Sequence, residues 1–291
     1  MNIIPCGTEY FDELFQLVLR LNADPSHHIG YFGVGETHIR EAFEESSIPT
    51  AEGFRLAFEN ERLIGALGVD ASHDIHRVWL LGPFIDDENW QRVADQLYDA
   101  VQPVLPQGDY EYELFCDVKN TNLHEFALRH GFFARAESAI MFLLRKDYQR
   151  AAKDQVQIFD FQDSFFDQFQ TLHDRVFPNT YLTAKQVVEK IDDRHRLLMA
   201  VEDEKLLGYI FGKVEDESGY VDFLAADESV RRRGIGADLL ARALDWMFIS
   251  PSTQSVHLTT NTDSVAAISL YNKFGFSTER VTRGYRKTSN V

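Results

Sequence analysis

The chain has 291 residues, more than one hydrophobic core usually serves, so two domains are expected. Its formal net charge of −17 argues against a nucleic-acid partner, because phosphate backbones are bound by clustered Lys and Arg. The cysteines, Cys6 and Cys116, lack metal-ligand spacing, so we expect neither a metal site nor a disulfide framework.

No uninterrupted apolar run approaches the ~20 residues of a membrane span. The first residues also lack the basic and long apolar regions of a signal peptide. We therefore expect a cytoplasmic protein without a membrane partner.

The first half alternates between strand and helix patterns. A tight turn at 59–61 predicts a hairpin, and Gly82-Pro83 predicts a bulge or an edge in its strand. The expected strands are 2–5, 53–59, 62–69, 76–85, 110–118 and 132–145, and the expected helices are 9–21, 36–45, 89–101 and 123–130.

The second half has the same kinds of element in the same order. Ser164 is a plausible N-cap, Gly275 a helix stop, and residues 202–204 a tight turn. The expected strands are 155–161, 196–201, 205–214, 219–226, 255–260 and 277–286, and the expected helices are 164–176, 183–191, 237–248 and 264–274.

This repeated order predicts duplicated domains, 1–147 and 154–291, with the boundary in the polar stretch 146–154. One local comparison supports the duplication. A helix followed by Gly-Phe occurs at 126–132 and again at 270–276, and each copy follows an Asn-Thr pair, Asn120-Thr121 and Asn261-Thr262.

The stretch Arg231-Arg-Arg-Gly234-Ile-Gly236, which we call the basic turn, joins a strand to a helix. It has the features of a phosphate site. Its glycines permit positive φ and close approach of the backbone. The free N–H groups and the positive end of the helix dipole attract an anion. A solvated basic run is the alternative interpretation.

Two stretches resemble the GNAT acyltransferase superfamily. Its R/Q-x-x-G-x-G/A signature reads Arg231 to Gly236, and its A-I-x-L-Y-x-K-x-G-F stretch reads Ala267 to Phe276. The resemblance implies an α+β fold of two tandem GNAT-like domains. Each is expected to be a mixed, mostly antiparallel twisted sheet flanked by helices.

By this resemblance, acetyl-CoA is the co-substrate and lies between strands 219–226 and 255–260, which splay apart at a bulge. Two positions depart from the pattern: Ser229 or Glu228 replaces the usual Pro, and Ser264 replaces the usual Asn. The residues implied to bind acetyl-CoA are Leu224, Ala225, Ala226, Arg231, Arg232, Arg233, Gly234, Ile235, Gly236, Ala237, Asn261 and Ser264.

Two side chains are candidates for catalysis. Tyr271 matches the family tyrosine that gives a proton to the departing thiolate, unless its ring only packs on the core. Asp222 lies where the family often carries an acidic base, unless it is a carboxylate pointing into solvent. Since neither cysteine lies in the matched motifs, we expect direct attack by the amine in a ternary complex.

The first half lacks this chemistry. Asp86-Asp87-Glu88 stands where the basic turn stands in the second half, and Ala127 aligns with Tyr271. Carboxylates there repel a pyrophosphate, so we expect no acyl-CoA site of the usual kind. The polar segment 24–35, with His27 and His28, is interpreted as a flexible lid or an acceptor-site loop.

The sequence thus predicts an N-acetyltransferase that acts on a small-molecule amine or a peptide amine, as a monomer or a homodimer. The alternatives left open are a non-enzymatic acyl-CoA-binding sensor and a partner-binding protein.

Overall fold

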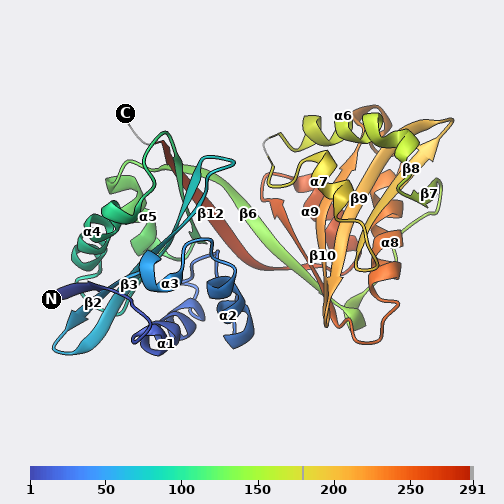
Figure 1. Ribbon diagram of the computed structural model, residues 1–291. Helices are drawn as coiled ribbons and strands as arrows, with labels where there is room; N and C mark the ends of the chain where they lie inside the picture. The colour runs from blue at the N-terminus through green and yellow to red at the C-terminus, as the bar shows by residue number, and fades with distance from the viewer. Residues whose placement is uncertain (179, 289–291) are drawn as a thin grey trace. The chain divides into compact units, whose positions relative to one another are not determined.

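The structure, a computed structural model, describes residues 1–178 and 180–288. The chain divides into two compact units (Figure 1). Unit 1 comprises Met1–Glu137 and Val281–Val291, and unit 2 comprises Ser138–Arg280. Across the described residues, every helix is too short or too polar to span a bilayer.

The first half of the chain contains the elements that its pattern predicts and one short helix, α3, that it does not. The hairpin turn between β2 and β3 places Asn60 and Glu61 at positive φ, as a two-residue turn requires. The elements are β1 (Asn2–Pro5), α1 (Phe11–Asn22), α2 (Glu36–Glu44), α3 (Thr50–Gly53), β2 (Arg55–Glu59), β3 (Arg62–Ser72), β4 (Arg77–Ile85), α4 (Trp90–Val101), β5 (Glu111–Asp117), α5 (Thr121–Arg129) and β6 (Phe133–Leu144).

The second half repeats the order, including a hairpin turn with Asp203 and Glu204 at positive φ. One expected cap differs: a 3-10 turn precedes α6, and Phe165 rather than Ser164 is the N-cap. The elements are β7 (Gln157–Asp160), α6 (Phe166–Val176), α7 (Ala184–Glu189), β8 (His195–Glu202), β9 (Lys205–Glu215), β10 (Ser218–Ala226), α8 (Ile235–Met247), β11 (Ser255–Asn261), α9 (Val265–Lys273) and β12 (Ser277–Thr288).

The sheets of the two units have the same strand order. It is β1-β2-β3-β4-β5-β12 in unit 1 and β7-β8-β9-β10-β11-β6 in unit 2. In each sheet the fourth and fifth strands pair in parallel and the other pairs are antiparallel. This confirms the expected α+β class with mostly antiparallel sheets flanked by helices.

The sheet of unit 2 buries both faces (Figure 1). Ile210 packs with α8 and α9 on one face, while its neighbour Tyr209 packs with α6 and α7 on the other. Successive strand residues point to opposite faces, so a strand covered on both sides is apolar almost throughout. The run Leu206–Phe211 has this pattern.

The final strand of each sheet comes from the other half of the sequence. The Ser138–Leu144 part of β6 (green in Figure 1) pairs with β11 in unit 2. The Thr282–Thr288 part of β12 (red) pairs with β5 in unit 1. The compact units therefore differ from the expected division at 1–147 and 154–291, because the two halves exchange their last strands.

The polar stretch between the halves packs on α8. The carboxylate of Asp238, which is 2% exposed, accepts the backbone N–H groups of residues 153, 154 and 155 at 2.8–3.0 Å. Asp245 accepts from the Tyr148 hydroxyl at 2.8 Å and from Arg150 at 3.0 Å. These contacts fix the stretch along α8, with Asp238 in the first turn of the helix and Asp245 in its last.

Candidate functional site

A β-bulge at Asp222 interrupts β10. The register with β9 shifts between Val221, opposite Gly212, and Phe223, opposite Phe211, so Asp222 is the extra residue. The bulge also reverses the faces of the strand: Val221 packs on the α8 side, while Phe223 packs on the α6 and α7 side. A bulge of this kind bends a strand away from its neighbour.

Strands β10 and β11 separate at this bulge. Their parallel pairing runs from Ser218–Ser255 to Val221–Leu258, and in the described part of unit 2 it stops there. Among the described residues, the continuation of β10, Phe223–Ala226, pairs with β9 alone, and the continuation of β11, 259–261, pairs with β6 alone. We call the space between these two continuations the fork. Leu224, Ala225 and Ala226 lie on its unpaired edge.

The basic turn follows directly after the fork. Arg232 (φ 67°) and Gly234 (φ 88°) are both in the left-handed region, and Gly234 is the N-cap residue of α8. Within the described chain, four backbone N–H groups donate no hydrogen bond: those of Arg232, Gly234, Ile235 and Gly236. The N–H of Ala237 is already used, because it donates to Gly234 O at 2.9 Å.

Four free donors at the positive end of a 13-residue helix can attract an anion without the help of a side chain. The arginine side chains contribute unequally. Arg231 donates to Glu228 at 2.9 Å and Arg233 donates to Glu202 at 2.7 Å, whereas Arg232 has no ionic partner among the described residues. These exposed pairs leave Arg232 as the arginine available to an anion.

The Asp222 carboxyl is largely enclosed. Its Oδ1 accepts a hydrogen bond from the Tyr181 hydroxyl at 2.5 Å, and its Oδ2 is buried without a partner in the described structure. Burial raises the pKa of Asp222, while the Tyr181 hydrogen bond and Lys213 lower it. Asp222 therefore does not point freely into solvent.

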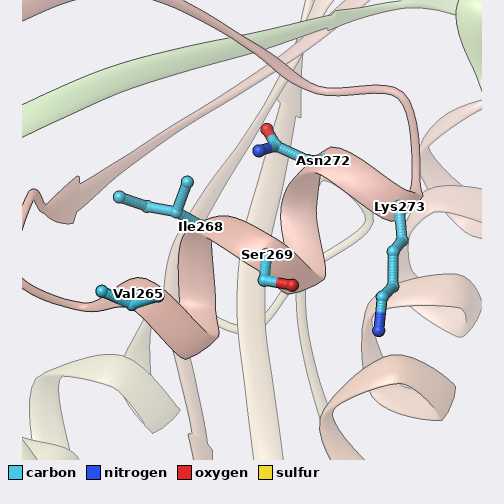
Figure 2. Close-up of a pocket in the computed structure, with 5 residues that line it drawn as sticks. All are labelled: Val265, Ile268, Ser269, Asn272 and Lys273. Carbon is cyan, nitrogen blue, oxygen red and sulfur yellow. The ribbon is translucent and has the colours of Figure 1, made fainter.

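Tyr271 lies on α9 and is 7% exposed. Its ring packs against Phe276 with centroids 5.8 Å apart, and burial raises the pKa of its phenol to about 12. A hollow of about 490 Å³ on α9 does not include Tyr271 (Figure 2). It is lined by Val265, Ile268, Ser269, Asn272 and Lys273.

The remaining two predicted residues lie at the start of this helix. Asn261 ends β11, and Ser264 is the N-cap of α9, but the Ser264 side chain accepts no capping hydrogen bond. In unit 1 the N-cap of α5 is Asn120, which accepts from Leu123 N at 3.1 Å. Asn120 thus corresponds to Ser264, and the Asn-Thr pairs compared in the sequence occupy different places.

In unit 1 the chain itself fills the corresponding fork. The parallel pairing of β4 with β5 stops at Trp79–Glu113. Beyond it, Ile29 forms an antiparallel bridge with Cys116, and Gly30 N donates to Phe115 O at 2.7 Å. The side chain of Asn22, which is 0% exposed, forms three hydrogen bonds with the backbone of residues 29–33 and so holds this segment in place.

The segment 28–32 is therefore a packed plug rather than a flexible lid, which corrects the interpretation of 24–35. Ile29 and Phe32 are each 1% exposed. Asp86, where the other unit has its basic turn, is paired with Arg20 and Arg62. Unit 1 thus lacks an open fork as well as a basic turn, so its GNAT-like copy is degenerate.

Sequence reasoning missed the role of one residue in unit 2. Tyr181 lies between α6 and α7 in an aromatic stretch and is not among the site residues that the sequence predicts. Its ring stacks on Phe223 with centroids 5.2 Å apart, which places its hydroxyl on Asp222. The aromatic composition of the stretch was the available signal, but the partner lies 41 residues away.

Comparison with known proteins finds one family model that matches part of the second half. The model of the acetyltransferase (GNAT) family matches residues 158–276, a range that includes Asp222, the basic turn and Tyr271. The comparison with curated proteins gave no match.

Solved structures share the fold over the whole length. A GCN5-related N-acetyltransferase from Sphaerobacter thermophilus has a TM-score of 0.71 at 12% identity, covering 94% of this chain and 91% of that one. A tandem GNAT protein from the clavulanic acid biosynthesis pathway has a TM-score of 0.58 at 12% identity, covering 100% and 99%. Members of this family in general transfer acetyl groups from acyl-CoA to nitrogen. Residues 158–276 therefore match the GNAT acetyltransferase family, and the whole chain has the fold of a tandem GNAT protein, with a first copy that lacks the open fork and the basic turn in its described residues.

Proposed function

We propose that unit 2 is an acetyl-CoA-dependent N-acetyltransferase of the cytoplasm, acting on a small primary amine or an amine of a peptide. One observation carries this proposal. A single run of fifteen residues, 222–236, contains the bulged carboxylate, the unpaired strand edge and the turn with four free N–H groups. These are the parts needed for the acceptor, the thioester arm and the diphosphate.

The residues present fit acetyl-CoA as co-substrate. The free N–H groups from Arg232 to Gly236, with the Arg232 side chain, are suited to the diphosphate. The strand edge at Leu224–Ala226 is suited to the pantetheine arm, and its N–H groups to polarising the thioester carbonyl. Asn261 and Ser264 border the other side of the fork. Acetyl-CoA supplies an activated acetyl group.

Asp222 is the proposed base. An amine acceptor arrives mostly as its ammonium ion and must lose a proton before its nitrogen can attack. The Asp222 carboxylate accepts that proton, and its raised pKa makes it a better proton acceptor than an exposed carboxylate. The amine nitrogen then bonds to the thioester carbon as the carbon–sulfur bond breaks.

Tyr271 is the proposed acid. With a pKa raised to about 12, its phenol keeps its proton at neutral pH and can give it to the departing thiolate. Transfer is direct, because burial raises the pKa of Cys6 to about 11 and that of Cys116 to about 12. Both cysteines therefore remain thiols, and a thiol is a poor nucleophile.

Substitution at Gly236 tests the proposal. A Cβ there meets Leu270 Cδ2 at an ordinary 3.5 Å, so the position admits the Cβ that Ala and Asp share. Asp in the first turn also favours a helix. We expect Gly236→Asp to fold normally but to lose the thermal shift with acetyl-CoA and all turnover, because its carboxylate repels the diphosphate. Gly236→Ala is the matched control and should keep both.

The same two measurements on the wild-type protein distinguish the two alternative functions, an acyl-CoA sensor and a partner-binding protein. Wild-type protein that gains thermal stability with acetyl-CoA, but acetylates no amine in a panel of polyamines, amino acids, aminoglycosides and peptides, is an acyl-CoA sensor. Wild-type protein without any thermal shift is a partner-binding protein, since a ligand that binds only the native state must stabilise it.

A further inference from the structure

Tyr181 contacts Asp222 from outside the sheet. It lies in the segment between α6 and α7, and its hydroxyl donates to Asp222 Oδ1 at 2.5 Å. Its ring stacks on Phe223 with an interplanar angle of 25°. The side chain is nevertheless 60% exposed, so this contact is not a consequence of core packing. Tyr181 covers the bulge from the solvent side.

The other groups near Asp222 are bound elsewhere. Lys213 on β9 donates to Glu215 Oε1 at 2.7 Å, and His195 on β8 contacts Asp192 Oδ1 at 2.8 Å. Tyr220 on β10 shares a hydrogen bond of 2.9 Å with Thr259. Lys213, His195 and Glu215 act on Asp222 only through their charge. Among the described residues, Tyr181 alone forms a hydrogen bond with this carboxylate.

We propose that Tyr181 is a positioning residue: its hydroxyl binds Asp222 Oδ1 and so fixes the orientation of the carboxylate that takes the proton of the acceptor amine. This inference rests on the proposed function. A carboxylate on the extra residue of a bulge has no regular strand geometry to orient it. The hydrogen bond from Tyr181 restricts its rotation and keeps Oδ2 in the enclosed position where it has no partner.

Removing the hydroxyl has a defined effect on pH dependence. The Tyr181 hydrogen bond lowers the pKa of Asp222, so Tyr181→Phe should raise that pKa further above the ordinary value. The base must be ionised, so the acid limb of the pH profile of kcat/KM should move to higher pH. At neutral pH we expect a loss of roughly tenfold, less than the 10²–10⁴-fold expected for losing the base itself.

The experiment compares four full-length proteins: wild type, Tyr181→Phe, Asp222→Asn and the matched control Tyr220→Phe. The control removes a phenolic hydroxyl from the same strand region that forms no hydrogen bond with Asp222. For each, we would measure the pH profile of kcat/KM and the thermal shift with acetyl-CoA. Tyr181→Phe should move the acid limb without changing the thermal shift, whereas Tyr220→Phe should leave the limb in place.

An acid limb of Tyr181→Phe that coincides with that of wild type, or moves no more than that of Tyr220→Phe, overturns the inference while the proposed function stands. A wild-type protein that acetylates no amine overturns both. A ¹³C NMR titration of the Asp222 carboxyl, assigned with Asp222→Asn, is independent of turnover. An unchanged titration in Tyr181→Phe shows that the hydroxyl does not hold the carboxylate and also overturns the inference.

Discussion

The strand exchange makes an unusual prediction about Tyr285, which lies near the end of the chain but belongs to the core of unit 1. Its side chain is 1% exposed, and its hydroxyl contacts His124 Nδ1 at 2.9 Å. Truncating a buried aromatic side chain costs about 3–5 kcal/mol. We therefore expect Tyr285→Ala to destabilise unit 1 by about that much, although the substitution follows the entire sequence of unit 2.

A second substitution divides this effect into its parts. Tyr285→Phe keeps the ring and removes only the hydroxyl, so the lost hydrogen bond to His124 should cost about 1 kcal/mol. The rest of the Tyr285→Ala effect, about 2–4 kcal/mol, is then the loss of buried ring surface and the cavity that remains.

Hydrogen exchange measured by mass spectrometry on the full-length protein locates the effect. With Tyr285→Ala, peptides from β5 and α5 should exchange faster, and those from β10 and α8 should not. Met141→Ala is the matched control, because Met141 is 0% exposed, lies on β6 and packs in the core of unit 2. It should give the opposite pattern. Faster exchange in unit 2 with Tyr285→Ala, and none in unit 1, would refute the exchange of strands.

Three further predictions concern the site. Burial raises the pKa of Asp222, so the folded protein binds a proton on this carboxyl more tightly than the unfolded chain does. The stability that this proton contributes is present at low pH and is lost as pH rises through the raised pKa. Asp222→Asn should therefore raise Tm at pH 7 by about 2–4 °C, for roughly 1 kcal/mol, while turnover falls 10²–10⁴-fold; calorimetry showing a lower Tm contradicts this. Tyr271→Phe should lose turnover but keep acetyl-CoA binding, and equal loss of both in kinetic and thermal-shift assays would make Tyr271 structural. Isothermal titration should give one acetyl-CoA per chain, because residues 28–30 fill the fork of unit 1; two equivalents would show that the plug opens.

The elements themselves could be predicted because their signals are local. The tight turns at 59–61 and 202–204 predicted both hairpins, and the run Leu206–Phe211 is apolar because its strand is covered on both faces. The basic turn was also visible, since a strand, two glycines and a helix N-terminus follow one another along the chain. Its four free N–H groups are a direct result of that local order.

Partner choice between distant segments could not be predicted. The strand pattern of residues 138–144 is compatible with an edge position in either sheet. It therefore did not indicate that β6 completes the sheet of unit 2 and β12 that of unit 1. The plug was hidden for a related reason: Ile29 and Phe32 lie within a stretch that is polar as a whole, and their partners, among them Cys116, are distant in the sequence.

The sequence by itself therefore determined the two GNAT-like repeats, their elements and the phosphate-binding character of residues 231–236, because short-range periodicity and turn chemistry encode these. The tertiary structure alone decided which sheet each last strand joins, why the first fork is closed, and how Tyr181 holds Asp222. Those outcomes depend on side chains that meet across 41 to more than 160 positions of the chain, and no local pattern records which of the possible partners packs best.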